Sequence, residues 1–474
     1  MKGDGGTPWH VDATGEEGSG TVLIIDAGWR GWVLGTRKIS TECKEQIKPL
    51  LHETADQFED PCVVVRDYGK GLIPAIEEFV HERNVKIIIL GCHTHFIKFV
   101  GKDLLTSEYS KLRQLIRNHN IRAGLKRIVR EWSRELGENI FELKTKIEIW
   151  ISPDKAQPLP KGNLGLATVR AMTQSALDYL ENSKNQRFPF VMPHFEFYQR
   201  CTTLHKACEF YIDHPLTDKP VLKALNRLFR VLYPVFSDSS FEQITQSLSY
   251  QFKLFTELRT ALRLNPDDAT KEVMPGVREP QRIAGELNDI KKALRKYKAE
   301  LQRVRRRVTQ DNQNAIDTIL KHLKEHEKNL WGHTMKIPKS AGGGIKIVGR
   351  TNNEIENFNG GLKRDERKRS GRKVLSKDFE DLPDGVPLIK NLKKPDYVKI
   401  LCGSLDNLPD AIAKIDHTER AKKYTKKTQS INTKLSPTTS LPKSDRQFIR
   451  KINIAEFIQN VAAQNVPKIL AFTP

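Results

Sequence analysis

The fold is decided by the stretch Val63-Val64-Val65-Arg66-Asp67-Tyr68-Gly69-Lys70-Gly71. Three consecutive β-branched apolar residues predict a buried strand, and the glycines predict a turn directly after it. Asp67 is the last residue before that turn, so its carboxylate is expected at the end of a core strand. A carboxylate in this place can bind a metal ion or act on a reacting bond. The alternative for Asp67 alone is that it caps the turn, a common use of aspartate.

Strand and helix patterns on both sides give this stretch its place in a fold. Further strands are predicted at 10–14, 21–27, 29–40 and 86–91, of which the second and third form a hairpin. Helices are predicted from a cap at Thr41 and over 73–84. The resulting order is strand, strand, strand, helix, strand, helix, strand. This order predicts an α/β fold with a mixed sheet, and it is the order of the ribonuclease H fold.

From about Thr106 to Trp331 the pattern changes to helices almost throughout. The clearest predicted helices are 165–182, 194–212, 220–235 and 240–264. Pro220 suits a first helical position, because a helix needs no N–H there. The sequence therefore predicts the first part of a ribonuclease H-like core at 1–105, an all-α insertion domain at 106–335, a return to the core at 336–415, and a basic, partly disordered tail at 416–474.

A heptad pattern marks the end of the helical region, between Ile283 and Val308. Apolar residues recur there at alternating steps of four and three, and the other faces are rich in Lys and Arg. The pattern predicts a long helix that packs on a neighbour in its own chain or pairs between two chains. An ordinary core helix and a basic helix lying along DNA are the alternatives.

Composition indicates a polyanionic partner. The 474 residues carry a net charge of +21, with a pI of about 9.6. This balance favours nucleic acid first and an acidic membrane surface second. The chain contains no apolar run of about 18 residues, which excludes a membrane-spanning helix. Six scattered cysteines do not make a disulfide framework, so we expect the reducing interior of a cell.

A second stretch, Arg350 to Arg364, matters as much as the first. Residues 336–350 predict a loop that lacks the Gly-Lys-Ser/Thr ending of a phosphate-binding P-loop. Thr351 or Asn352 then caps a predicted helix, which carries Glu356 beside its buried apolar stripe. That stripe consists of Ile355, Phe358 and Leu362. Seven residues with five cations follow at 363–369, and on spacing alone this is a capped, solvated helix.

Four motifs together resemble a known family. Residues 11–14, 66–71 and 351–356 resemble the three acidic motifs of DDE transposases with a ribonuclease H-like core. Between the second and third, Cys92-His93-Thr94-His95 is similar to the Cys-x-x-His signature of the branch that includes Mutator-like and hAT elements and related bacterial insertion sequences. That branch carries a large helical domain between its second aspartate and its glutamate. The resemblance covers about residues 7–106 and 345–373.

The resemblance implies a DNA transposase that cleaves transposon ends and transfers the freed strand to target DNA. Asp12, Asp67 and Glu356 would be its catalytic residues and would hold two Mg²⁺ or Mn²⁺ ions, with Cys92 and His95 as active-site support. Double-stranded DNA is the implied partner of a homodimer or higher oligomer in a prokaryotic, nucleoid-associated setting. The implied DNA-binding residues are Asn352, Asn353, Lys363, Arg364, Arg367, Lys368, Arg369 and Arg372.

Several alternatives stay open. Asp26 rivals Asp12 because it also ends an apolar strand, but choosing it would leave only one strand before the helix. Glu354 is the weaker rival of Glu356. Cys92 and His95 are alternatively zinc ligands, although no second Cys/His pair with suitable spacing follows. Because such transposases usually carry an N-terminal DNA-binding domain and little sequence precedes Asp12, the alternative function is a truncated or inactive, transposase-derived DNA-binding or regulatory protein.

Overall fold

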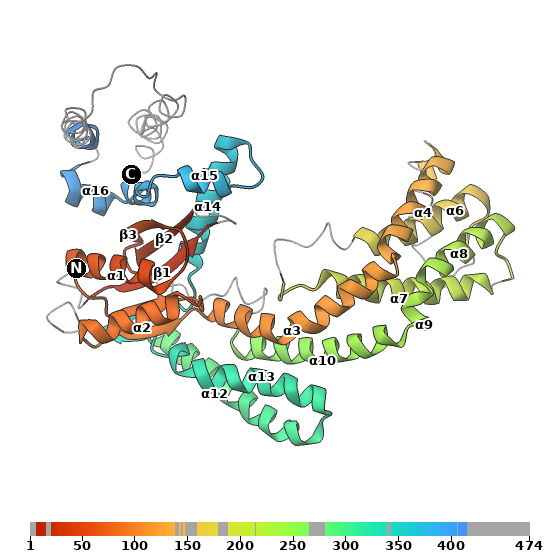
Figure 1. Cartoon of the computed structure of the whole chain (residues 1–474), viewed down its shortest axis with the longest axis horizontal. Coiled ribbons are helices and arrows are strands. Elements are labelled where there is room, and N and C mark those ends of the chain that lie inside the picture. Colours follow the sequence, from red (N-terminus) through yellow and green to blue (C-terminus); the bar gives the residue numbers. More distant parts are fainter. Residues whose placement is uncertain are drawn as a thin grey trace, which may run out of the picture. The chain divides into compact units, whose positions relative to one another are not determined.

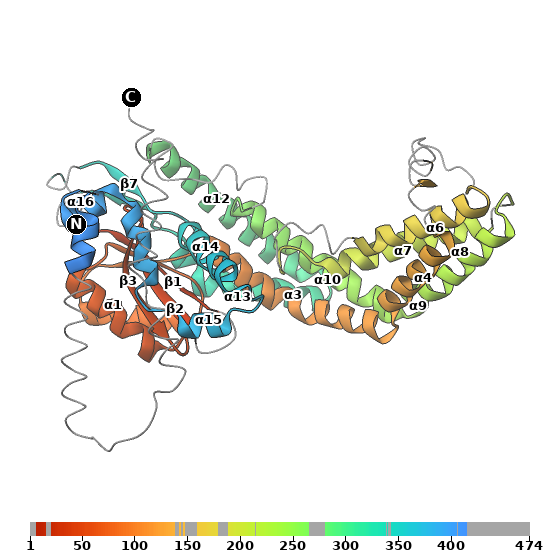
Figure 2. The same ribbon diagram turned by 90° about the horizontal axis from the view of Figure 1, so that it is seen from above.

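The structure is a computed structural model (Figures 1 and 2). It describes residues 6–15, 20–137, 142–143, 146, 159–178, 188–213, 215–264, 280–337, 339, 343–404 and 406–414. The chain divides into two compact units, Met1–Asp12 with Glu42–Asn359 and Ala13–Thr41 with Gly360–Pro474. The divisions fall inside the first strand and inside the helix that carries Glu356. The predicted tail at 416–474 lies outside the described residues.

Three parallel strands form the centre of the first unit. They are β1 (Pro8–Thr14), β4 (Val63–Arg66) and β5 (Ile88–Gly91). Val63, Val64 and Val65 are fully buried, as the opening stretch predicts. β4 pairs with β1 on one side and with β5 on the other, so that Arg66 lies opposite Val11 and opposite Gly91. The pairing of the three strands therefore stops at one edge, where β4 and β5 end and β1 continues to Thr14.

Two helices follow the predicted places beside these strands. They are α1 (Lys44–Phe58) and α2 (Leu72–Arg83), which pack against each other. Trp9 of β1 stacks on Phe79 of α2 with ring centroids 6.0 Å apart. The predicted cap at Thr41 is wrong, since Cys43 occupies the N-cap position and makes no side-chain capping bond. The helix lacks an N-cap bond and relies instead on its buried apolar face.

The whole sheet has the strand order β3-β2-β1-β4-β5. β2 (Thr21–Ala27) and β3 (Trp32–Ile39) pair antiparallel, whereas β1, β4 and β5 are parallel. The predicted α/β class with a mixed sheet is confirmed. The ribonuclease H-like character of the sheet stays a prediction.

The remainder of the first unit is mainly helical. Its helices are α3 (His93–Asn118), α4 (Ile121–Leu136), α6 (Gly162–Leu177), α7 (Pro193–Ile212), α8 (Lys219–Leu232), α9 (Pro234–Ser237), α10 (Ser239–Ala261), α12 (Pro280–Val304) and α13 (Gln310–His326). Figure 1 shows α3 lying along α10, and α4, α6, α7 and α8 gathered near the far end of α3. The four predicted helices are present, and Pro220 lies in the first turn of α8. The predicted boundary at 105/106 lies inside α3.

One apolar core runs through these helices. It begins at Tyr68, directly after Asp67, and continues through Phe96 and Val100 on α3 to Leu330. The turn that follows β4 is therefore tied to the helical part of the unit by buried side chains.

The heptad residues are used within the chain. α12 ends at Val304, and a 3-10 helix at Arg305–Arg307 turns the chain toward α13. The helix packs against α10, where the Tyr297 hydroxyl donates to the Leu254 carbonyl at 2.8 Å. Its buried seam residues are Ile283, Leu287, Ile290, Leu294 and Leu301. Packing on neighbours in the same chain, one of the two predicted uses, is the observed one.

The predicted loop at 336–350 contains more structure than expected. β6 (Thr334–Lys336) and β7 (Ile345–Ile347) form an antiparallel hairpin. Ile347 packs against Ile283 and Leu287 of α12. The strand pattern is only three residues long on each side, which is too short for periodicity to show it.

The second unit holds β2, β3 and the short elements α15 (Ser376–Asp381), a 3-10 helix at Val386–Lys393, and α16 (Pro395–Cys402). Asn391 exchanges two hydrogen bonds with the backbone of Val33, at 2.7 and 2.8 Å. The side-chain amide thus replaces a neighbouring strand for β3. α14 (Asn353–Ser370) runs from the first unit into the second. No helix among the described residues is long and apolar enough to cross a membrane.

Gly71 provides a test of the turn after β4. A Cβ atom at this position would lie 1.8 Å from the Glu42 carbonyl oxygen, although the φ angle of −84° suits any residue. Because the backbone cannot yield, we expect Gly71→Ala to lower the free energy of unfolding by about 3 kcal/mol or more. Gly285→Ala is the control, since its Cβ meets nothing within 4 Å and a helical alanine adds about 0.5–1 kcal/mol. Urea denaturation followed by circular dichroism measures both, and equal stabilities would contradict the account.

Candidate active site

Three chemically reactive side chains lie in a row at the carboxyl edge of the parallel strands. Asp12, Asp67 and Cys92 directly follow Val11, Arg66 and Gly91, which lie opposite one another in the sheet. The Cys92 N–H donates to the Arg66 carbonyl at 2.8 Å, so the pairing continues one step beyond β5. Neighbouring strands are about 4.8 Å apart. The strand register alone therefore brings two aspartates and a cysteine to one edge.

Asp67 caps the turn that follows β4, and its side chain remains partly exposed. Its Oδ1 accepts the Gly69 N–H at 2.8 Å, which is the turn-capping role foreseen as the alternative. The preceding Arg66 is 1% exposed, and its Nη1 donates to the Asp67 carbonyl at 3.0 Å. The capping bond engages one carboxylate oxygen, so capping and metal binding are compatible.

Glu42 is an acidic neighbour that the sequence did not indicate. Burial, followed by the negative charge of Asp67, raises the pKa of the Glu42 carboxyl. A Cβ on Gly69 would touch both carboxylates, 3.1 Å from Asp67 Oδ1 and 3.4 Å from Glu42 Oε2. No motif singles out this glutamate, because it only precedes α1 and reaches Asp67 through the fold.

Asp12 is buried and paired with a side chain from α14. It is 6% exposed, and its Oδ2 accepts the Asn359 Nδ2–H at 2.8 Å. Its rival Asp26 lies in the second unit, where it forms an ion pair with Lys390 at 2.6 Å. Asp26 thus has a structural partner of its own. The geometry favours Asp12 as the carboxylate that accompanies Asp67.

One polar face of α14 lies on the same edge. Asn352, Glu356 and Asn359 follow at steps of four and three, which places them on one side of a helix. Asn352 is fully buried, and its Oδ1 lies 2.9 Å from His10 Nδ1. On the other side, Ile355 and Leu362 are buried, as predicted. The side chains of Asn353 and Glu354 are outside what the structure describes.

Glu356 meets the Cys-x-x-His stretch. Its Oε1 lies 3.5 Å from His95 Nδ1, and the Asn352 N–H donates to Cys92 Sγ at 3.3 Å. Burial raises the pKa of the Cys92 thiol to about 12. Among the described residues, Cys92, His95 and Glu356 form the one group of three potential metal ligands whose donor atoms all lie within 4.8 Å of one another. Asp12, Asp67 and Glu356 together do not meet that limit.

The cations of α14 are mostly exposed. Lys363 donates to the Gly15 carbonyl at 2.6 Å, and Arg369 pairs with Glu366 at 2.6 Å. The exposed members of the predicted DNA-binding set are Arg364, Arg367, Lys368, Arg369 and Arg372. The prediction that Asn352 binds DNA is wrong, because its side-chain amide is fully buried and hydrogen-bonded to His10.

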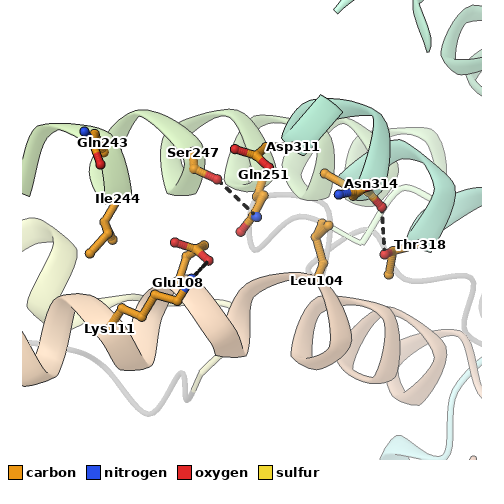
Figure 3. A pocket seen from close by; sticks show the side chains of 11 residues that line it. Leu104, Glu108, Lys111, Gln243, Ile244, Ser247, Gln251, Asp311, Asn314 and Thr318 are labelled. Carbon is orange, nitrogen blue, oxygen red and sulfur yellow. Dashed lines mark hydrogen bonds and ion pairs between the residues drawn. The ribbon is translucent and has the colours of Figure 1, made fainter. Parts of the chain in front are cut away.

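A polar groove of about 380 Å³ lies elsewhere in the first unit, between α3, α10 and α13 (Figure 3). Its lining groups bond one another, as in the Glu108–Lys111 pair at 2.7 Å and the Gln251–Ser247 pair at 3.4 Å. None of the predicted site residues lines it. We therefore assign the groove no part in the candidate site.

No protein-family model, no curated protein and no solved structure matches the chain. Its function is therefore argued from the geometry of this edge.

Asn359 tests the contact between α14 and Asp12. Asn359→Ala removes the donor to a buried carboxylate, so we expect the free energy of unfolding to fall by about 1–3 kcal/mol. Asn357→Ala, at an exposed position of the same helix, is the matched control and should change it by less than about 0.5 kcal/mol. Urea titrations of the two variants decide the matter. Indistinguishable midpoints would mean that the Asp12 contact is not maintained in solution.

Two buried histidines beneath the edge predict acid sensitivity. The rings of His93 and His333 are 5.1 Å apart, and burial, then Arg350 and His10, lowers the pKa of His333 to about 3. In the unfolded chain a histidine titrates at about 6.5, so only the unfolded state takes up this proton between these values. Stability from His333 is complete above about pH 6.5 and is lost as the pH falls toward 3.

His333→Gln should therefore make the free energy of unfolding less steeply dependent on pH between 6.5 and 4. The largest expected change is one proton, or about 1.4 kcal/mol per pH unit. Denaturant titrations at several pH values measure the slope. An unchanged slope would contradict a depressed pKa at His333.

Proposed function

We propose that the chain is a metal-dependent DNA transposase with a ribonuclease H-like core, which cleaves phosphodiester bonds at transposon ends and joins the freed strand to target DNA. One observation carries the proposal. Asp12 and Asp67 follow opposed residues of adjacent parallel strands, and the helix that bears Glu356 is bonded to the same edge through Asn352 and Asn359. These contacts support a site in which three carboxylates from distant parts of the sequence act together.

The donor set fits hard divalent cations. Mg²⁺ and Mn²⁺ prefer carboxylate oxygens, and Asp12, Asp67 and Glu356 would hold them. Glu356 Oε1 is a buried atom without a hydrogen-bond partner. Burial, and then the charge of Asp67, raises the pKa of Glu42 beside this carboxylate. Such ions, when bound, activate an attacking oxygen and stabilise a leaving one.

The 4.8 Å limit is no obstacle to this assignment. Two ions in such sites are about 3.5–4 Å apart, and carboxylates on different ions are separated further than ligands of a single ion. What the chain itself supplies is orientation. The Gly69 N–H and the Asn359 amide each hold one carboxylate, at 2.8 Å in both cases. Their directions are fixed before any ion or DNA arrives.

The basic residues suit a phosphate backbone. Exposed Arg364, Arg367 and Lys368 in α14 bind phosphates without reading sequence, and the net charge of +21 acts in the same sense. The proposal includes double-stranded DNA at transposon ends and targets, a homodimer or higher oligomer on that DNA, and a nucleoid-associated location in a prokaryotic cell.

Asp67→Asn tests the activity. DNA carrying the two sequences that flank the coding sequence is incubated with the full chain and Mg²⁺ or Mn²⁺, and nicked products with free 3′-hydroxyls are measured on denaturing gels. We expect the amide to reduce cleavage about 100-fold or more, because it is a poor ligand for hard ions. Asp365→Asn, at an exposed position of α14, is the control and should cleave normally.

Two outcomes would contradict the proposal. Cleavage that survives Asp67→Asn would show that the carboxylate is not part of the site. A wild-type chain that shifts the same DNA in a binding gel, yet never cuts it with either metal, would favour the alternative of an inactive, transposase-derived DNA-binding protein.

A further inference from the structure

We propose that Cys92, His95 and Glu356 form a binding site for a thiophilic divalent cation, with Zn²⁺ as the typical ion. The site shares Glu356 with the proposed catalytic carboxylates but includes neither Asp12 nor Asp67, and Cys92 and His95 allow it to be tested independently of the proposed function. Its three donor atoms, one sulfur, one imidazole nitrogen and one carboxylate oxygen, all lie within 4.8 Å of one another.

The spacing matches a tetrahedral ion. Zn²⁺ binds nitrogen and oxygen ligands at about 2.0–2.2 Å, which puts two such donors about 3.3–3.6 Å apart at a tetrahedral angle. His95 Nδ1 and Glu356 Oε1 are 3.5 Å apart. This separation is wide for a hydrogen bond and suitable for two ligands of one cation.

Both of these atoms lack the partner that burial demands. His95 Nδ1 and Glu356 Oε1 are buried and make no hydrogen bond, although each belongs to a side chain that is partly exposed, at 17% and 37%. Unsatisfied buried polar atoms are rare in native proteins, and a bound ion is one recognised way in which such atoms are satisfied. A cation between them would satisfy both atoms at once.

The sulfur is arranged to receive positive charge. Cys92 occupies the N-cap position of α3, and although burial raises the pKa of its thiol overall, the backbone N–H groups of His95 and Asn352 lower that pKa. The Asn352 N–H points at Sγ from the other side, at 3.3 Å. Hydrogen bonds of this kind support the sulfur ligands of metal centres. A thiolate, an imidazole and a carboxylate make a set that Zn²⁺ accepts and Mg²⁺ does not favour.

The structure supplies the third ligand that the sequence did not indicate for a zinc site at Cys92 and His95. A zinc site was disfavoured because no second Cys/His pair follows Cys92 and His95. The third ligand instead comes from α14, and Glu356 arrives through the fold rather than through a local motif. Three protein ligands leave the fourth position of a tetrahedral ion open. Water can reach this position because the Glu356 side chain is partly exposed.

Cobalt substitution tests the site without any DNA. The full chain, reduced and freed of metal with a chelator, is titrated with Co²⁺ and followed by absorption. We expect one equivalent to produce a thiolate-to-cobalt charge-transfer band in the near ultraviolet, and Zn²⁺ to remove it by displacement. Cys92→Ser should abolish the band, and His95→Ala and Glu356→Gln should each weaken Co²⁺ binding about 10- to 100-fold or more.

Two controls separate this site from others in the chain. Cys62→Ser replaces a thiol at the opposite end of β4 and should keep the band. Asp67→Asn should also keep it, so loss of DNA cleavage and loss of cobalt binding are independent results. No band in the wild type, or a band that persists in Cys92→Ser, would overturn the proposal.

A second measurement covers the case in which Cys92→Ser does not fold. X-ray absorption at the zinc edge of the Zn²⁺-loaded wild type should show one sulfur at about 2.3 Å together with nitrogen and oxygen ligands. A first shell without sulfur would exclude Cys92 as a ligand and overturn the site.

Discussion

Everything at the candidate site depends on the register of three parallel strands. Val11, Arg66 and Gly91 lie opposite one another, so the next residue of each strand emerges at the same edge. This register is strongly specified, because a slip by one residue would turn buried side chains to the other face of the sheet. Both faces of β4 are buried, so such a slip would disrupt the side-chain packing on each face, and this packing fixes the positions of Asp12, Asp67 and Cys92. Hydrophobic burial positions the polar chemistry.

α14 attaches to this edge through polar contacts that tolerate little change. Asn352 and Asn359 are buried, and each bonds a group on or beside β1. Buried polar networks are costly when broken and specific when satisfied. The two amides lie about one turn on either side of Glu356, so they set both the rotation and the position of the helix along its axis. Glu356, between these two amides in the sequence, thereby lies beside the Cys92 sulfur and the His95 imidazole.

The sequence could predict much of the fold, since its strands carry strong β-branched patterns and its helices strong apolar periods. It could not predict contacts that the polymer makes over long separations. The Cys92 and Glu356 side chains meet across a separation of more than two hundred residues, and no local pattern encodes that meeting. Glu42 was missed for the same reason. The steps of four and three from Asn352 through Glu356 to Asn359 place these residues on one face of a helix. Polar residues on a helix mostly face solvent, so this spacing did not predict that Asn359 is buried.

The charge of the edge argues for a cation within it. Asp12, Asp67 and Glu42 bring carboxylates close to the edge formed by β1 and β4, and burial, followed by the charge of Asp67, raises the pKa of Glu42. Arg66 at the end of β4 is 1% exposed, lies over the Tyr68 ring at 5.7 Å and approaches Glu77 at 3.7 Å. Arg66 is thus shared among several neighbours and does not serve Asp67 alone. Exposed charges farther away than about 8–10 Å are screened by salt and add little here. In the proposed function, divalent ions bound at close range would supply positive charge at this edge, and the carboxylate oxygens would hold them.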